Sequence, residues 1–321
     1  MSDTTAGRPS GGLLRGLPWL VWRRHRAALT IGLAVTVLLC AYFVYQHFAV
    51  VDFVREYGTE PGERTTLAFG ERFGTVFNGG SVLLSGLPAL IGLFLGAPLI
   101  SGEQEHGTVR LVTTQSVSRG RWIAATLALP LLLVVLCTTA LSMAFRWMWA
   151  PVHVLAFHSD WLNSGPFDVT GPMLPAKALL FAVCGIALGV VLKRILTAMV
   201  ATVVFMGAFS FVWERVPAHL GTLRRMFAPL ADTPPIPVDA IYMDNWVATA
   251  DGKLYGFGTC AETTESATTA CEKKLGITQS VTDYFGFDQM AGMQWRGSLL
   301  MLAASVLILG FVIWRAHRRP L

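Results

Sequence analysis

Residues 174–213 read LPAKALLFAVCGIALGVVLKRILTAMVATVVFMGAFSFVW, and they contain two apolar runs, 174–192 and 195–213. Only Lys193 and Arg194 separate the two runs. A membrane-spanning helix needs about 20 consecutive, mainly apolar residues, so each run is long enough to cross a bilayer. The two-residue polar break between them predicts a tight hairpin of two spanning helices.

Four further apolar runs of similar length occur in the chain, and the overall composition agrees with them. Of the 321 residues, 53% are hydrophobic and 14% are charged, whereas about 25% charged residues is usual for a soluble domain. We therefore predict an all-α polytopic membrane protein with six transmembrane helices. In chain order, the predicted spans are residues 27–49, 79–101, 122–145, 174–192, 195–213 and 297–314.

The distribution of Lys and Arg predicts the orientation of these spans. With both termini in the cytoplasm, the cytoplasmic pieces hold 13 of the 25 basic residues and three of the 20 acidic residues. Cytoplasmic loops of membrane proteins carry such an excess of Lys and Arg. The topology divides the chain into four parts. Residues 1–26 are a cytoplasmic N-terminus with an interfacial helix at 17–26, and residues 27–213 hold spans one to five with a cytoplasmic loop at 102–121. Residues 214–296 form a large extracellular segment, and residues 297–321 hold span six and a basic cytoplasmic tail.

The five cysteines fall into two groups. Cys40, Cys137 and Cys184 lie in apolar runs, where a cysteine usually packs as a small apolar residue. Cys260 and Cys271 lie in the predicted extracellular segment, where a disulfide can persist. We expect these two to be bridged, which would stabilise the fold by about 3 kcal/mol; the alternative is two free thiols.

The spans lack the groups that ion coupling or catalysis would need. None carries a charged residue near its centre, and Lys177 is close enough to the end of its run to reach the headgroups. The chain contains no phosphate-binding loop, no GxSxG and no HExxH motif. We therefore expect no catalytic residue, no metal site and no cofactor in this chain. Small-residue pairs, Gly92 with Gly96 and Gly185 with Gly189, predict close helix packing.

The sequence of the loop at 102–121 predicts the end of one helix, followed by a short second helix. The second span is expected to continue as helix to His106, and Gly107 can adopt the left-handed conformation that ends a helix. Thr108 can then cap a short helix at about 109–115, which would lie parallel to the membrane. The alternative interpretation is a simple capped turn.

This loop resembles the cytoplasmic loop of ABC-2 type transporter permeases, in a form similar to actinobacterial members. That family has an acid pair, Gly-Thr, an apolar patch and a Ser-Arg turn before span three. The chain departs from the pattern at Ser116 and Thr126, where many members have proline and lysine. The matching residues are Glu103, Glu105, Gly107, Thr108, Leu111, Ser118 and Arg119.

The resemblance implies a non-catalytic permease subunit of an ATP-driven exporter in the bacterial plasma membrane. Such a subunit forms the translocation pathway with a second permease copy or a sister permease, in the lipid bilayer and without nucleic acid. Separate ATP-binding cassette subunits bind ATP and Mg²⁺, and they dock on a coupling helix within the loop at 103–119, to which Arg110 would also contribute. The family further implies re-entrant helices, for which 227–238 and 284–295 are the expected stretches.

Two other functions remain open from the sequence. A permease-like immunity or regulatory component could sense or expel a peptide without general export. A membrane enzyme or secondary carrier without an ATPase partner would need buried catalytic or ionisable groups, and the spans offer none. The apolar spans fit a drug, a lipid or a peptide as cargo equally well.

Overall fold

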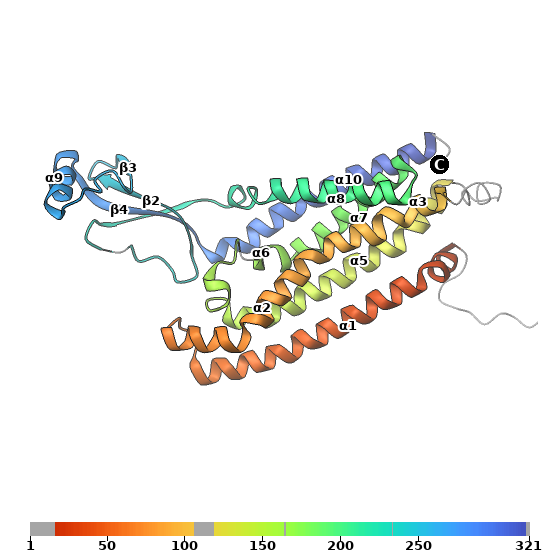
Figure 1. Ribbon diagram of the computed structural model, residues 1–321, viewed down its shortest axis with the longest axis horizontal. Helices are drawn as coiled ribbons and strands as arrows, with labels where there is room; N and C mark the ends of the chain where they lie inside the picture. Colours follow the sequence, from red (N-terminus) through yellow and green to blue (C-terminus); the bar gives the residue numbers. More distant parts are fainter. Residues whose placement is uncertain (1–16, 106–118, 164, 233, 319–321) are drawn as a thin grey trace, which may run out of the picture.

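The computed structural model describes residues 17–105, 119–163, 165–232 and 234–318, and shows a bundle of long helices with a small β-sheet at one end (Figure 1). Six of the helical stretches are long and apolar enough to cross a membrane, as the sequence predicts. We call the end of the bundle with the sheet the sheet end. The opposite end, where Glu105 ends one helix and Ile195 begins another, is called the loop end.

The spanning helices contain the predicted apolar runs, and several extend well beyond them. The segment 17–26 is continuous with the first spanning helix and does not form a separate element. The predicted hairpin is confirmed, because two helices are joined by Lys193 and Arg194 alone. The main helices are α1 (Leu17–Tyr57), α2 (Glu63–Ile91), α3 (Ala97–Glu105), α5 (Arg119–Trp149), α7 (Met173–Leu192), α8 (Ile195–Trp213) and α10 (Met290–Arg318).

The first half of α2 was not part of the predicted span, and it packs on the end of α1. Phe69, Phe73 and Phe77 recur every four residues and are all buried, so they form one apolar face of the helix. Phe53 of α1 contacts this face, with ring centroids 5.7 Å from both Phe69 and Phe73. This aromatic cluster explains why the helix starts 16 residues before the apolar run, at Glu63.

The centre of the bundle is α7, which packs closely against the helix broken by η1 (Gly92–Gly96), a short π-helix between α2 and α3. A methyl group on Gly189 would lie 2.6 Å from the carbonyl oxygen of Ala97, and one on Gly96 would lie 2.5 Å from that of Ala182. Only glycine allows backbones to approach so closely. The predicted close packing is therefore confirmed, and the two glycine pairs face each other.

Short helical turns connect α5 to α7 at the sheet end. They are η2 (Ala150–Val152), η3 (Ala156–Ser159) and α6 (Pro166–Val169). Lys177 of α7 forms an ion pair with Asp168 of α6, with 2.7 Å between Nζ and Oδ2. The expectation that Lys177 reaches the headgroups is wrong, because its side chain is only 10% exposed and a carboxylate lies within reach.

Between α8 and α10, the chain forms a four-stranded antiparallel sheet in the order β1-β4-β2-β3. The two re-entrant helices expected at 227–238 and 284–295 are not formed: the first stretch begins in a strand, and the second passes from a strand into α10. The connecting turns are η4 (Pro217–His219) and η5 (Phe287–Gln289). The strands are β1 (Arg224–Pro229), β2 (Ile241–Thr249), β3 (Leu254–Gly256) and β4 (Ile277–Phe285).

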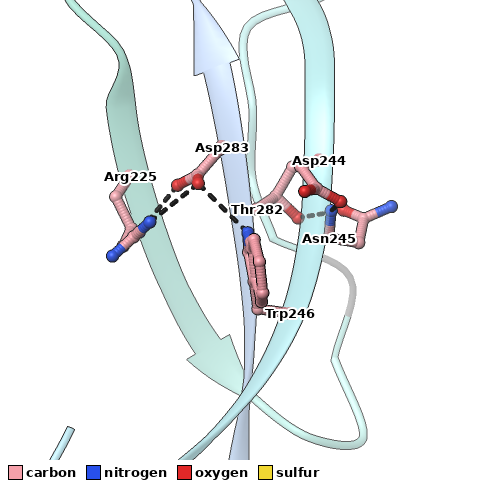
Figure 2. A network of polar contacts seen from close by, with 6 residues as sticks. All are labelled: Arg225, Asp244, Asn245, Trp246, Thr282 and Asp283. Atoms are coloured by element: carbon pink, nitrogen blue, oxygen red, sulfur yellow. Dashed lines mark hydrogen bonds and ion pairs between the residues drawn. The ribbon is translucent and has the colours of Figure 1, made fainter. Parts of the chain in front are cut away.

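A polar network crosses the sheet beside its central strand (Figure 2). Arg225 donates two hydrogen bonds to the carboxylate of Asp283, at 2.7 and 2.8 Å, and the indole N–H of Trp246 donates a third at 3.1 Å. The Arg225 guanidinium lowers the pKa of the Asp283 carboxyl below its usual range, because it bonds to the charged form. This network joins β1, β4 and β2.

A disulfide lies against residues of the two central strands of the sheet. Cys260 and Cys271 are bonded to each other, as the sequence predicts. Cys271 lies in α9 (Glu265–Leu275), and Cys260 packs with Val247 and Ile277 in a small apolar cluster. The bridge therefore holds α9 and its preceding loop against the sheet.

Candidate coupling site

The predicted coupling loop begins within the last turns of α3. As expected, the helix continues past the apolar run, and it ends in the described part of the chain at Glu105. Ser101 is fully buried and donates its hydroxyl hydrogen bond to the carbonyl of Ala97, within the helix. This turn of α3 is therefore packed into the bundle.

The turn between α7 and α8 lies at the same end of the bundle. Lys193 ends α7 in the left-handed conformation with φ 59°, and its N–H donates to the carbonyl of Gly189 at 3.0 Å. Arg194 is extended, and its side chain does not cap the next helix. The first N–H groups of α8 therefore need acceptors from elsewhere.

Glu105 supplies one such acceptor. The N–H of Ile195, the first residue of α8, donates a 3.0 Å hydrogen bond to Oε2 of Glu105. A carboxylate at a helix N-terminus pairs a free N–H group and interacts favourably with the helix dipole, which together contribute about 1 kcal/mol. The last residue of α3 is therefore attached to the beginning of α8.

Gln104, one residue earlier, has an unusual environment. Both polar atoms of its side-chain amide are buried, and neither has a hydrogen-bond partner in the described part of the chain. An unpaired buried polar group costs about 1–3 kcal/mol. A polar partner at the end of α3 would therefore stabilise the protein.

The structure places only some of the predicted coupling residues. Glu103 and Glu105 lie in the last turns of α3, and Arg119 begins α5. The remaining predicted residues lie outside the described residues, so the expected short helix and its caps stay predictions. They are Gly107, Thr108, Arg110, Leu111 and Ser118.

At the loop end, the described residues connect α3 with the α7–α8 hairpin. The described residues show no group of three or more His, Cys, Asp or Glu side chains that could hold a metal ion. What they do show is that α3 is tied to α8 through Glu105 and to α7 through the close contact of Ala97 with Gly189. A displacement of α3 would therefore carry the α7–α8 hairpin with it.

A protein-family model described as ABC-2 membrane transporter related matches residues 33–216, which is more than half of the chain. The chain belongs to the ABC-2 membrane transporter related family. It is therefore a permease-type component of a transporter and a multi-pass membrane protein, and the predicted membership of the chain in the ABC-2 permeases is confirmed. The match to the family runs from α1 to just beyond α8, and the sheet and α10 lie outside it. No curated protein and no solved structure matches the chain.

Sequence reasoning identified Glu105 but missed the partner of its carboxylate. The partner is a backbone N–H 90 residues away, and no side-chain pattern marks such a group. One signal was present: neither Lys193 nor Arg194 is a residue that usually caps a helix, so the start of α8 lacked a local acceptor.

Proposed function

We propose that the chain is the membrane subunit of an ATP-driven exporter in the bacterial plasma membrane. Separate ATP-binding cassette subunits bind ATP and Mg²⁺ and dock at the loop end. This chain, paired with a second copy or with a sister permease, forms the translocation pathway.

The hydrogen bond between Glu105 and Ile195 carries this proposal. A coupling loop is useful only if the helices behind it respond together when it is pushed. Glu105 joins the end of α3 to α8, and the glycine contacts join α3 to α7. Because helices and packed backbones are stiff, a push on the loop at 102–121 would move three elements as a unit.

The charges at the loop end support the cytoplasmic position of the docking surface. Lys193 and Arg194 are both exposed in the turn of the hairpin. The C-terminal turns of α10 carry further basic residues, and they reach the same end of the bundle (Figure 1). Basic residues concentrate on the cytoplasmic side of bacterial membrane proteins, where ATP is available.

Two variants of the loop test the proposal. Gly107→Val should misorient the short helix, because a β-branched residue disfavours the positive φ that the turn is expected to need. Glu105→Arg would place a cation against the positive end of α8, and the helix dipole would repel it. Both variants leave the apolar runs unchanged, so both should insert in the membrane.

The measurement is co-purification of the ATP-binding subunit, together with transport-dependent ATP turnover in proteoliposomes. We expect each variant to lose most of the transport that accompanies ATP hydrolysis. If both variants insert, bind the ATP-binding subunit and remain fully coupled, the loop is a simple turn and the proposed function is wrong.

A further inference from the structure

The helix α8 is held to the bundle along a narrow stripe. Val204 and Phe211 are among the many apolar side chains of α8 that face outward. Thr202 is buried but donates its hydroxyl hydrogen bond to its own helix. The buried residues of α8 are Ala198, Thr202, Met206 and Trp213. Apolar contact of this kind is non-directional, so it allows the helix to move.

In the described part of the chain, a polar contact ties α8 to another element near each of its ends. At the loop end, Glu105 accepts from the N–H of Ile195. At the sheet end, the indole N–H of Trp213 donates a 3.0 Å hydrogen bond to Oδ1 of Asp168. The second carboxylate oxygen of Asp168 accepts from Lys177 of α7 at 2.7 Å. One carboxylate thus joins α6, α7 and α8.

The segment that carries Asp168 is fixed by other helices. Gln294 of α10 donates hydrogen bonds from its side-chain nitrogen to the carbonyl of Phe167 at 3.0 Å and to that of Thr170 at 3.1 Å. Ser142 of α5 donates to the carbonyl of Gly171 at 2.8 Å. Asp168 is therefore presented on a support that does not depend on α8.

The two bonds to Asp168 differ in what their loss would cost. Breaking the bond to Lys177 would leave two unpaired charges with little exposure, which is strongly unfavourable. Breaking the bond to Trp213 leaves the carboxylate paired with Lys177 and frees only a neutral N–H group, although the Trp213 ring, which is 7% exposed, also loses packing when α8 moves. Of the two bonds, the one to Trp213 therefore opens at the lower electrostatic cost.

We propose that Asp168 is a latch that holds the sheet end of α8 against α7, and that this end of α8 moves away when the bond to Trp213 opens during transport. Lys177 keeps the Asp168 carboxylate paired and in position in both states. The proposal rests on the proposed function in one respect: motion at the loop end, transmitted through Glu105, supplies the force that opens the latch.

The latch can be tested in the chain alone by measuring a distance between two spin labels. Val212, at the sheet end of α8, and Met143 of α5 are both exposed, so labels there leave the packing intact. The three free cysteines, Cys40, Cys137 and Cys184, are first replaced by alanine. The labelled full-length chain is then studied in lipid nanodiscs by pulsed electron paramagnetic resonance.

The decisive variant is Trp213→Phe, which removes the N–H donor but keeps the Asp168–Lys177 pair. The parent should give one narrow distance. Trp213→Phe should raise the ratio of the displaced to the latched state by about 10- to 100-fold, since a hydrogen bond to a charged group is lost. Trp161→Phe is the matched control, because the Trp161 indole also donates a 3.0 Å bond, to the carbonyl of Asp239, away from α8.

Two results would overturn the latch. One is a Trp213→Phe label-distance distribution identical to that of the parent; the other is an equal displacement in Trp161→Phe.

A second experiment uses the complex with its ATP-binding subunit, trapped with nucleotide. In this complex, the parent chain should populate the label distance of the displaced state. A complex that couples ATP hydrolysis to transport while keeping a single narrow distance refutes the latch and leaves the proposed function standing. If the loop variants lose coupling, both the latch and the proposed function stand. If the loop variants stay fully coupled, the proposed function is wrong, but the label distances measured in the chain alone are not affected.

Discussion

The carboxylate of Glu105 accepts a hydrogen bond from the backbone N–H of Ile195, and so connects two helices that are 90 residues apart in the chain. Glu105 is the last residue of α3 and belongs to the predicted loop, and Ile195 is the first residue of α8. Because the end of α3 is bonded to the start of α8, we expect a displacement of one helix to be passed to the other. The contact therefore links the predicted coupling loop with the helix that the Asp168 latch holds at its other end.

Glu105→Ala should loosen this connection. Removing a carboxylate cap costs about 1 kcal/mol, so the fold should persist while coupling weakens. We expect ATP turnover of the reconstituted complex to become less dependent on transport, with insertion unchanged. Glu214→Ala is the matched control, because Glu214 is an exposed carboxylate at the opposite end of the same helix. Equal behaviour of the two variants would contradict the role of Glu105.

Gly185→Ala should destabilise the bundle at its centre. The added methyl group would lie 2.8 Å from the backbone nitrogen of Ala97 and would clash with the carbonyl oxygen of Gly92. Overpacking of this kind costs about 1–3 kcal/mol, and neither neighbour is a flexible side chain. We expect a lower unfolding temperature in lipid or detergent.

Gly207→Ala is the control for this effect, since nothing lies within 4 Å of the methyl group it would add. Alanine favours the helix over glycine by about 1 kcal/mol, so this variant should be unchanged or slightly more stable. A stable Gly185→Ala protein with the unfolding temperature of Gly207→Ala would show that α7 and η1 do not pack as described.

The spanning helices could be predicted because hydropathy and length suffice to recognise them. The hairpin at Lys193 was predicted to the residue, since two basic side chains interrupt an otherwise continuous apolar stretch. The extension of α2 back to Glu63 was missed, because its apolar face consists of single phenylalanines among polar residues. The pair formed by Lys177 was also missed, because Asp168 lies in the short helix α6, whose position between α5 and α7 the sequence does not specify.

The sheet could not be predicted from short-range pattern. Its first strand, β1, contains two arginines and is paired with β4, more than 50 residues later. The charge of Arg225 is accommodated by Asp283, which is 3% exposed, and such a pairing is visible only after folding. The composition of β4 was a usable signal, since Ile277, Val281 and Phe285 are β-branched or aromatic residues in a short segment.

The network around Asp283 makes the sheet sensitive to acid. The pKa of the Asp283 carboxyl is lowered in the folded protein by its hydrogen bonds to Arg225, so the stabilisation is complete above its unfolded pKa of about 4. It is lost as the pH falls below that value towards the folded pKa. The protection factors of the β4 amides, which correct for the pH dependence of intrinsic hydrogen exchange, should therefore fall below pH 4.

Asp283→Asn should remove much of this pH dependence. It should also destabilise the sheet at neutral pH by about 1 kcal/mol. This value is modest because Arg225 is 38% exposed, so water screens the ion pair. Asp288→Asn is the control, since it removes the exposed pair with Arg224. If Asp283→Asn has the same acid response as the parent, another group controls the sheet.

The predicted orientation places the loop end in the cytoplasm and the sheet outside. With the three free cysteines replaced, a cysteine at Ser266 on the exposed face of α9 should react with a membrane-impermeant maleimide added to intact cells. A cysteine at Lys193 should react only after the membrane is opened. The reverse pattern would contradict the topology and the docking surface proposed at the loop end.

The central claim is that an ATP-binding subunit docks on the loop at 102–121, and site-specific photo-cross-linking tests it most directly. A photoreactive amino acid is introduced at Arg110 in the loop and, as a control, at the exposed Phe257 beside the sheet. The complex is then irradiated in native membranes. The account predicts a cross-link to the ATP-binding subunit from position 110 and none from position 257. Efficient capture of that subunit from position 257, or its absence at position 110 in a complex that hydrolyses ATP, would contradict it.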